Sequence, residues 1–345
     1  MQKKKKSRKW RYIILLVVVI IGAVAAWMLF GPTVKEPEGK YLYIRTGATY
    51  EDVKDSLIKN KVISETLAFD KIARSVNYDK NIRPGRYKIS RGMNIINLVR
   101  MLKNGNQAPV NLTITKLRTR EDLARKLGEN FEFGTEQAMN FLNNKDSLAK
   151  YELDTNTVMT AIIPNTYTMT WNNTPAKVFS KLYREEEKFW TRDRKDKAQR
   201  LHLTPKEVYT LASIVEEETN MQADKGKIAS VYMNRINKGM NLAADPTVKY
   251  AMRNFGLKRI LYGHLAYESP YNTYRNKGLP PGPICTPSIK TIDAVLDQPE
   301  TDYLFFVAKP ELSGYSVFSN NYAEHQKHAK IYQAFLDSIG IKANP

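Results

Sequence analysis

A long apolar run near the beginning of the chain is the clearest feature of its hydrophobic pattern. Residues 12–30 contain no charged side chain, whereas residues 1–11 contain seven lysines or arginines and no acid. A helix over 12–30, rising about 1.5 Å per residue, just spans a hydrocarbon core of about 30 Å. Because positively charged flanks stay in the cytoplasm, we predict a cytoplasmic tail over 1–11 and a single transmembrane helix over 12–30 in the cytoplasmic (inner) membrane, with the remaining chain outside the cytoplasm. The alternative is a signal peptide cleaved near 23–25, but the apolar core of a signal peptide is only about 7–15 residues long.

The pattern after this helix predicts a short linker and a small folded module. Residues 31–40 contain two prolines and two glycines without apolar periodicity, which is typical of a linker. Within 41–106, strand-like alternation and helical spacing follow one another. The predicted elements are a strand at 41–44, a helix from Thr49, a helix at 65–76, a strand at 85–89 and a helix at 93–102. This order is similar to that of the LysM-type glycan-binding fold, and a structural spacer is the alternative.

The remaining residues, 107–345, are predicted to form a larger domain of helices and strands. One strand is predicted at 110–115, and the predicted helices are 120–127, 135–149, 176–200, 204–218, 226–238 and 247–252. The predicted fold class is therefore α+β, with one transmembrane helix, a small LysM-like α+β module and a larger α+β catalytic domain.

Composition adds little to the predicted fold, but the net charge indicates which classes of partner the protein could bind. Hydrophobic residues make up 42% of the chain, which is enough for packed cores. The formal net charge is +19, and a basic surface favours polyanions. Nucleic acid is not expected, because most of the chain is predicted to lie outside the cytoplasm and the sequence has no nucleic-acid-binding signature. The single cysteine, Cys285, excludes an internal disulfide, and the four scattered histidines form no metal motif, so we predict no metal and no cofactor.

Three adjacent glutamates end the predicted helix that begins at Thr204. The start of this helix is well marked by a threonine N-cap, a proline and a glutamate. At about 100° per residue, Glu217 falls opposite the centre of the apolar face and should face solvent, whereas Glu216 and Glu218 fall at its two edges. Partial burial at an edge raises the pKa of a carboxyl group, as a general acid requires. The spacing does not distinguish Glu216 from Glu218, and the simpler alternative is that all three are solvated or paired with nearby lysines such as Lys225.

Other polar residues with the chemistry to contact a sugar follow in the sequence. Asn234 stands on a largely apolar helix, and Asp245, which precedes a proline, is predicted to be the N-cap of the next helix. A loop rich in proline and glycine carries Tyr271, Asn272 and Thr273. Rigid aromatic loops suit carbohydrate, whose C–H faces stack on rings and whose polar groups need amide or hydroxyl partners. A structural role is the alternative for each residue, since most buried polar groups are hydrogen-bonded within the protein.

Several blocks of sequence occur here in an order that is typical of one protein family. They are LASIVEEET at 211–219, ASVYMNR at 229–235, DPTV at 245–248, YNTY at 271–274 and GLPPG at 278–282. Together they resemble the YceG/MltG family of membrane-anchored endolytic transglycosylases, and the resemblance covers almost the whole chain. It implies that Glu218 is the catalytic acid, with Glu217 in place of the family's usual lysine. Two further departures are Ala243, where the family often has glutamine, and Asn165, where its "PDTY" segment has aspartate.

The resemblance implies a peptidoglycan lytic transglycosylase in which one carboxyl group suffices. Glu218 would protonate the glycosidic oxygen between N-acetylmuramic acid and N-acetylglucosamine. It would then deprotonate the muramyl 6-hydroxyl, whose oxygen attacks C1 and closes a 1,6-anhydro ring. Cleavage of this kind would limit the length of nascent glycan strands. The expected partners are peptidoglycan strands and the cell-wall synthases known as penicillin-binding proteins. The residues expected to bind the substrate are Asn234, Asp245, Tyr271, Asn272 and Thr273.

Three other functions are compatible with the same residues. A lysozyme-like hydrolase would use Glu218 together with water and a second acid such as Asp245. A non-catalytic glycan-binding scaffold for cell-wall synthases would work through the LysM-like module. A membrane-bound polyanion binder would show steep salt dependence without glycan dependence.

Overall fold

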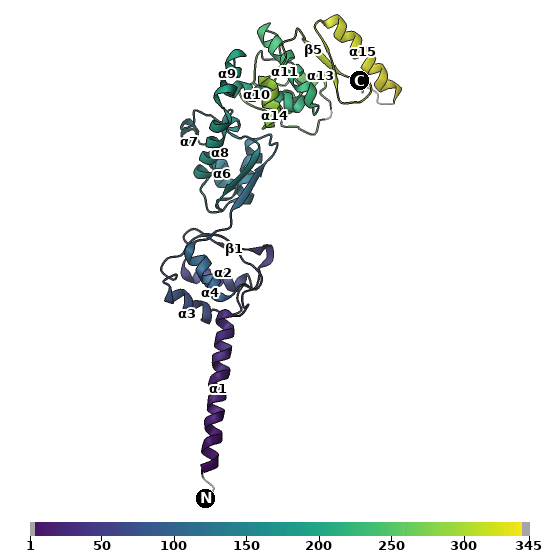
Figure 1. The fold of residues 1–345 in the computed structure, drawn as a ribbon. Helices are drawn as coiled ribbons and strands as arrows, with labels where there is room; N and C mark the ends of the chain where they lie inside the picture. The colour runs from purple at the N-terminus through teal and green to yellow at the C-terminus, as the bar shows by residue number, and fades with distance from the viewer. Residues whose placement is uncertain (1–3, 258, 340–345) are drawn as a thin grey trace. The chain divides into compact units, whose positions relative to one another are not determined.

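The chain folds into two compact units that are described separately here. The computed structural model describes residues 4–257 and 259–339. The first unit extends to Asn111 and includes Asn130–Glu132 and Thr168–Thr174, and the second contains the other residues. Both units mix helices with short strands, which confirms the α+β fold class (Figure 1). The division into a tail, a linker, a LysM-like module and a catalytic domain stays a prediction, and residues 1–3 of that tail and 340–345 of that domain lie outside the described residues.

Helix α1, Lys4–Phe30, contains the predicted transmembrane segment. Its part from Lys9 to Phe30 is long and apolar enough to cross a membrane, and its most apolar stretch is not buried within the protein. Among the described residues, it is the one helix with these properties. The helix also includes 4–11 of the predicted tail. A fully exposed apolar helix of this length suits a lipid environment, where every backbone polar group must be satisfied within the helix.

The first unit is built around an antiparallel pair of strands, in which Leu42 lies opposite Tyr87. Its elements after α1 are η1 (Glu38–Lys40), β1 (Tyr41–Ile44), α2 (Tyr50–Lys59), α3 (Leu67–Ser75), β2 (Gly85–Lys88) and α4 (Ile95–Asn104). The side chains of Thr49 and Asp52 form a capping box at the start of α2, and Gly105 ends α4 in the left-handed conformation. The predicted order of strand, two helices, strand and helix is confirmed.

The remaining elements lie wholly or mostly in the second unit. They are β3 (Val110–Ile114), α5 (Arg120–Asn130), α6 (Gly134–Asn143), α7 (Lys145–Ala149), η2 (Val158–Ala161), β4 (Asn165–Met169), α8 (Pro175–Phe189), α9 (Arg192–Arg200), α10 (Pro205–Glu218), α11 (Gln222–Asn237), α12 (Asp245–Ala251), α13 (Tyr262–Leu265), α14 (Ile289–Leu296), β5 (Phe305–Ala308), β6 (Ser316–Ser319) and α15 (Tyr322–Ser338). The first two residues of β3, the last residue of α5 and the last two residues of β4 belong to the first unit. Strand β3 pairs with β4, and β5 pairs antiparallel with β6. Helix α15 packs against the β5–β6 pair.

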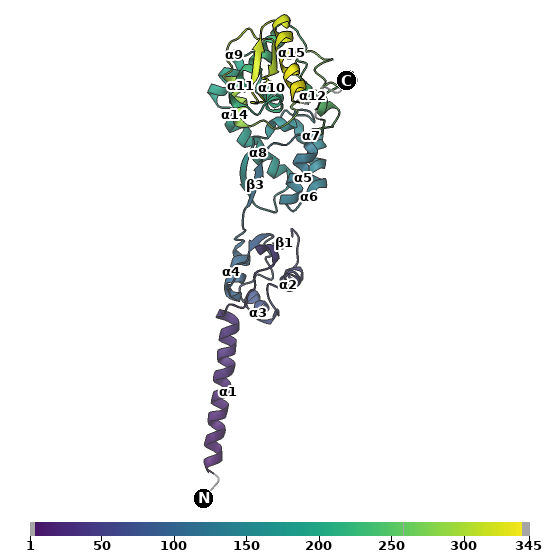
Figure 2. The ribbon, with the colours of Figure 1, turned by 90° about the vertical axis from the view of Figure 1, so that its right-hand side faces the viewer.

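Helix α10 forms the centre of the second unit. Thr204 and Glu207 form the predicted capping box around Pro205, and all residues from Val208 to Val215 are buried. A helix that is buried on every side needs neighbours all round, and α10 packs against α9, α11, α12 and α14. Figure 2 shows these helices gathered around α10. Because its core stretch is fixed in this way, the helix delivers the glutamates of its last turn to defined surroundings.

Several predicted elements differ from the observed ones at their ends. The predicted helix 176–200 is two helices, because Thr191 leaves the helical path and caps α9 with its side chain. The predicted helix 135–149 is likewise divided at Asn144, which caps α7. Helix α11 starts at Gln222 rather than at 226. In each case a polar residue or a loop competes locally with a continuous helical pattern.

Candidate active site

The three glutamates of the EEE segment lie in the last turn of α10, where the sequence places no basic residue. The carboxyl-terminal end of a helix carries partial negative charge, so each ionised glutamate there is disfavoured by roughly 0.3–1 kcal/mol. Such a choice of residues works against helix stability and is typical of functional sites. The three side chains, however, enter three different environments.

Glu216 belongs to a buried ion pair. Its Oε2 accepts a hydrogen bond from Nζ of Lys225 on α11 at 2.8 Å, and the hydroxyls of Thr291 and Ser288 at the start of α14 donate to the same oxygen. Burial acts to raise the pKa of Glu216, but the hydrogen bonds from Lys225 and Thr291 outweigh it and hold that pKa below its ordinary value. Glu216 therefore stays ionised and ties α10 to α11 and α14.

Glu217 is not exposed to solvent, and the prediction that it faces water is wrong. Its two carboxyl oxygens lie 3.0 Å from Lys116 Nζ and 3.0 Å from Arg118 Nη2, and only 15% of its side chain is accessible. Burial acts to raise the pKa of Glu217, but the two cations hold it below its ordinary value. The helical pattern of α10 did not reveal this pair, because Lys116 and Arg118 come from the segment after β3, which Leu117 and Thr286 fix through mutual hydrogen bonds.

Glu218 forms no ion pair with any cation in the part of the chain that the structure describes. Its Oε1 accepts a hydrogen bond from the hydroxyl of Tyr232 on α11 at 2.5 Å. The side chain keeps some contact with solvent, but the carboxyl group is surrounded by protein. Burial raises the pKa of Glu218 to about 7; the negative charge of Asp245 adds to this effect, and the Tyr232 hydrogen bond opposes it. Of the three glutamates, Glu218 is thus the one that carries a proton near neutral pH.

Asp245 and Tyr274 lie beside this carboxyl group. The Tyr274 hydroxyl donates to Asp245 Oδ1 at 2.6 Å, and both residues line a cavity of about 550 Å³. The prediction that Asp245 caps α12 is wrong, because the helix already begins at Asp245 and its N-cap is Ala244. The Asp245 carboxylate instead accepts a hydrogen bond from the Tyr274 hydroxyl, which keeps the carboxylate beside the cavity.

Asn272 and Thr273 are completely buried and position the loop that carries Tyr274. The Asn272 amide nitrogen donates to the carbonyl oxygens of Leu265 at 2.9 Å and Tyr267 at 2.8 Å, and its Oδ1 accepts from the backbone of Tyr274. The Thr273 hydroxyl accepts from the backbone N–H of Ala244 at 3.1 Å. Both side chains use their polar atoms within the protein, so they reach a substrate only through the loop that they hold.

Tyr271 and Asn234 also have partners within the protein. The Tyr271 ring packs on Tyr250 with ring centroids 4.8 Å apart. The Asn234 amide nitrogen donates to the carbonyls of Thr301 and Tyr303. The Asn234 side chain thus fixes the segment before β5, and its hydrogen bonds in the described part of the chain go to this segment rather than to the Glu218 site.

The sequence profile of the YceG-like family matches residues 42–331. The chain belongs to the YceG-like family. It is 28% identical over 335 residues to the endolytic murein transglycosylase of Bacillus subtilis, covering 91% of each protein. It is 27% identical over 323 residues to the endolytic murein transglycosylase of Streptococcus pneumoniae strain R6, and this match covers 83% of the chain and 57% of the relative. A crystal structure of a YceG-like protein from Listeria monocytogenes superposes with a TM-score of 0.56 at 27% identity, covering 83% of this chain and 97% of that one.

Two residues of this YceG-like site were missed by the sequence analysis. Tyr232 contacts Glu218, and Tyr274 contacts Asp245. Both stand inside the blocks that carry the family resemblance. Tyr232 looked like one of the apolar residues of its helix, and Tyr274 was predicted to lie in the proline- and glycine-rich surface loop but was not chosen as a site residue. The spacing of Tyr232 on α11 predicts its burial, and only the packing of α11 on α10 shows that its hydroxyl meets the carboxyl group.

The YceG-like fold contains no evident metal centre in the part of the chain that is described. No group of three or more histidine, cysteine, aspartate or glutamate side chains there has the arrangement to hold a metal ion. His325 and His328 both lie on α15, and Cys285 is a buried free thiol.

Proposed function

We propose that this protein is a membrane-anchored endolytic murein transglycosylase that cuts the bond between N-acetylmuramic acid and N-acetylglucosamine in peptidoglycan. The name of the Bacillus subtilis relative, which matches over 91% of both chains, supports the activity. The observation that carries the proposal is the environment of Glu218, the one glutamate of its segment whose pKa is raised, to about 7. Burial has already removed most of the water that would otherwise stabilise the ionised form.

The chemistry needs a group that first gives and then takes a proton. Protonated Glu218 donates its proton to the glycosidic oxygen as the bond from that oxygen to muramyl C1 breaks. The resulting Glu218 carboxylate then takes the proton of the muramyl 6-hydroxyl, whose oxygen bonds to C1 and closes a 1,6-anhydro ring. Glu218 ends the cycle protonated, and no water is consumed. A pKa near the working pH favours both half-steps.

The surrounding residues support this role for Glu218. Tyr232 donates to one carboxyl oxygen and so fixes the orientation of the group. Glu216 and Glu217 are held ionised by lysine and arginine, so neither has a proton to give near neutral pH. Because the nucleophile comes from the substrate, the second carboxylate of ordinary glycosidases is not required.

A lysozyme-like hydrolase is the second candidate, and Asp245 is the observation that favours it. The Asp245 charge contributes to the raised pKa of Glu218, which places the two carboxyl groups within electrostatic reach of each other. A hydrolase would use Asp245 to activate water or to form a covalent intermediate. Its products would carry reducing ends instead of anhydro ends.

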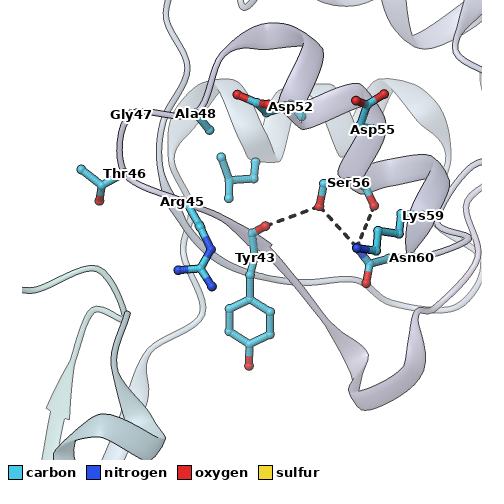
Figure 3. Close-up of a pocket in the computed structure, with 12 residues that line it drawn as sticks. Tyr43, Arg45, Thr46, Gly47, Ala48, Asp52, Asp55, Ser56, Lys59 and Asn60 are labelled. Atoms are coloured by element: carbon cyan, nitrogen blue, oxygen red, sulfur yellow. Dashed lines mark hydrogen bonds between the residues drawn. The ribbon is translucent and has the colours of Figure 1, made fainter. Parts of the chain in front are cut away.

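The location and the partners of the protein belong to the same proposal. We propose that α1 crosses the cytoplasmic membrane once with its basic flank inside, so that both units face the cell wall and meet cell-wall synthases there. The first unit has a cavity of about 630 Å³ between the end of β1 and helix α2, shown in Figure 3. Its lining includes the polar side chains of Arg45, Asp55 and Asn60, whose donors and acceptors suit the hydroxyl and amide groups of a sugar and support a LysM-like role.

The proposal is tested by the products released from purified peptidoglycan by the full-length protein in detergent. Mass spectrometry should find anhydromuramyl ends with the wild type and none with Glu218→Gln. Glu185→Gln is a matched control, because Glu185 forms only surface ion pairs with Lys181 and Lys188 on α8. Reducing ends would identify a hydrolase, and equal release by wild type and Glu218→Gln would refute the assignment of Glu218.

A further inference from the structure

The 550 Å³ cavity beside Glu218 has two chemically different walls. Asp245 and Tyr274 form one wall, and Arg259, Leu261 and Leu265 contribute to the other. The first wall belongs to the proposed catalytic centre, since the charge of Asp245 acts on Glu218. The second wall, from the segment before and within α13, has no part in the acid–base chemistry and adds a positive charge and apolar surface.

Among the residues that the structure describes, Arg259 differs from the other arginines around the site in having no partner. Arg253 pairs with Glu121, Arg275 pairs with Glu268, and Arg235 donates to backbone carbonyls. Arg259, by contrast, forms no ion pair or hydrogen bond with any residue in 4–257 or 259–339, and its side chain is exposed at the cavity. All five N–H donors of this guanidinium are therefore available to a ligand.

The chemistry of a peptidoglycan strand indicates what such a cation would bind. The sugar rings of the strand are uncharged, so they offer a guanidinium no ionic partner. The negative charge of a strand lies on the substituent at O3 of each muramyl residue, either in the carboxylates of the peptide stem or, where the stem has been removed, in the lactyl carboxylate. A guanidinium recognises a carboxylate through two parallel hydrogen bonds.

We propose that this cavity binds the carboxylate-bearing O3 substituent of a muramyl residue, with Arg259 pairing with the carboxylate. This inference rests on the proposed function and adds the part of the substrate that is recognised next to the cut. Leu261 and Leu265 offer apolar contacts to the methyl groups of lactyl and alanyl units. Asp245 also lines the cavity, and its negative charge repels the carboxylate, which favours pairing of the substituent with Arg259.

The size of the effect follows from the openness of the site. A hydrogen bond to a charged group contributes more to binding free energy than an ion pair that is fully exposed on the surface. The pair formed by Arg259 should contribute an intermediate amount, because Arg259 is exposed but lines a cavity. Removing its charge should weaken binding of carboxylate-bearing strands by about tenfold. The maximal rate should change by less than about twofold, since Arg259 has no contact with Glu218 or with the reacting atoms.

The test compares three substrates with the full-length protein in detergent. They are glycan strands with intact stems, the same strands with their carboxylates converted to amides, and strands stripped of stems by an amidase. Arg259→Gln should raise KM about tenfold on intact strands and leave KM on amidated strands unchanged, and Arg259→Lys should restore part of the loss. On intact strands the free carboxylates belong to the stem, so an effect there assigns a stem carboxylate as the partner of Arg259. An effect on stripped strands as well shows that the lactyl carboxylate takes its place once the stem is gone.

A control and a binding measurement make the outcome decisive. Arg192→Gln removes the same charge from an almost fully exposed position on α9 and should change KM on none of the substrates. Equal losses by Arg259→Gln on intact and amidated strands, or no loss on either, would overturn the proposal. Co-sedimentation of Glu218→Gln with and without Arg259→Gln reports carboxylate binding without turnover, so this proposal can be judged even where the products refute the proposed function.

Discussion

Replacing Glu218 by glutamine should make the second unit more stable at neutral pH while leaving its stability at acidic pH unchanged. The reason lies in the raised pKa of Glu218, about 7 in the folded protein against an ordinary 4.5. The folded state binds this proton more tightly than the unfolded state, so its contribution to stability is fully present below pH 4.5 and is lost as the pH rises to about 7. Glutamine has the same shape, can still accept the Tyr232 hydrogen bond, and has no charge to bury.

The size of this effect follows from the two pKa values. One pKa unit corresponds to about 1.36 kcal/mol, so the shift from 4.5 to about 7 amounts to about 3 kcal/mol of unfolding free energy. The difference between Glu218→Gln and wild type should grow from near zero at pH 4.5 to about 3 kcal/mol at pH 7 and stay constant above it. In a unit of this size, that difference corresponds to roughly 6–12 °C in Tm.

The assay is thermal unfolding of the full-length protein in detergent, followed at several pH values between 4 and 8.5. The burial of Glu186 on α8 also raises its pKa to about 7, but this contribution is common to both proteins and cancels in the difference. Glu217→Gln is the opposing control: Lys116 and Arg118 hold the pKa of Glu217 below its ordinary value, so this variant should lose stability at neutral pH and recover relative to wild type in acid. A Tm difference for Glu218→Gln that does not depend on pH would refute the reasoning.

Three further predictions concern the neighbours of the acid. Tyr232→Phe removes the hydrogen bond that lowers the pKa of Glu218, so the alkaline limb of the rate–pH profile should move upward from about 7, and a downward shift would contradict the assignment. Asp245→Asn removes a charge that raises the pKa of Glu218, so the same limb should move downward in steady-state kinetics. Lys225→Met leaves the Glu216 carboxylate buried without its ion-pair partner and should cost about 3–5 kcal/mol in unfolding free energy at pH 8, measured by denaturant titration, with a smaller loss at pH 4.

Local patterns were enough to predict the elements that frame the site. The start of α10 followed from Thr204, Pro205 and Glu207, because a capping box is a local arrangement that needs no tertiary partner. The helical pattern also placed Glu216 and Glu218 at opposite edges of the apolar face, and these side chains do meet different partners: Glu216 contacts Lys225 and Thr291, and Glu218 contacts Tyr232. The strands and helices of the first unit followed from the same kind of pattern.

Long-range contacts explain what the sequence could not show. Glu217 was placed in solvent because its two cations are about a hundred positions away in the chain, on a segment fixed by Thr286. Asp245 looked like a helix cap, because its partner Tyr274 comes from a distant loop. The roles of such residues depend on which elements pack together, and that information is not contained in local spacing.

Cleavage of peptidoglycan in oxygen-18 water tests the central claim most directly. If Glu218 directs the muramyl 6-hydroxyl to C1, the new muramyl ends contain no oxygen from solvent and are lighter by one water than hydrolysis products. Mass spectrometry of the products should therefore show unlabelled anhydro ends from the wild type and none from Glu218→Gln. Muramyl ends that carry oxygen-18 would show that water is the nucleophile, and the site would then be that of a hydrolase in which Asp245 takes part.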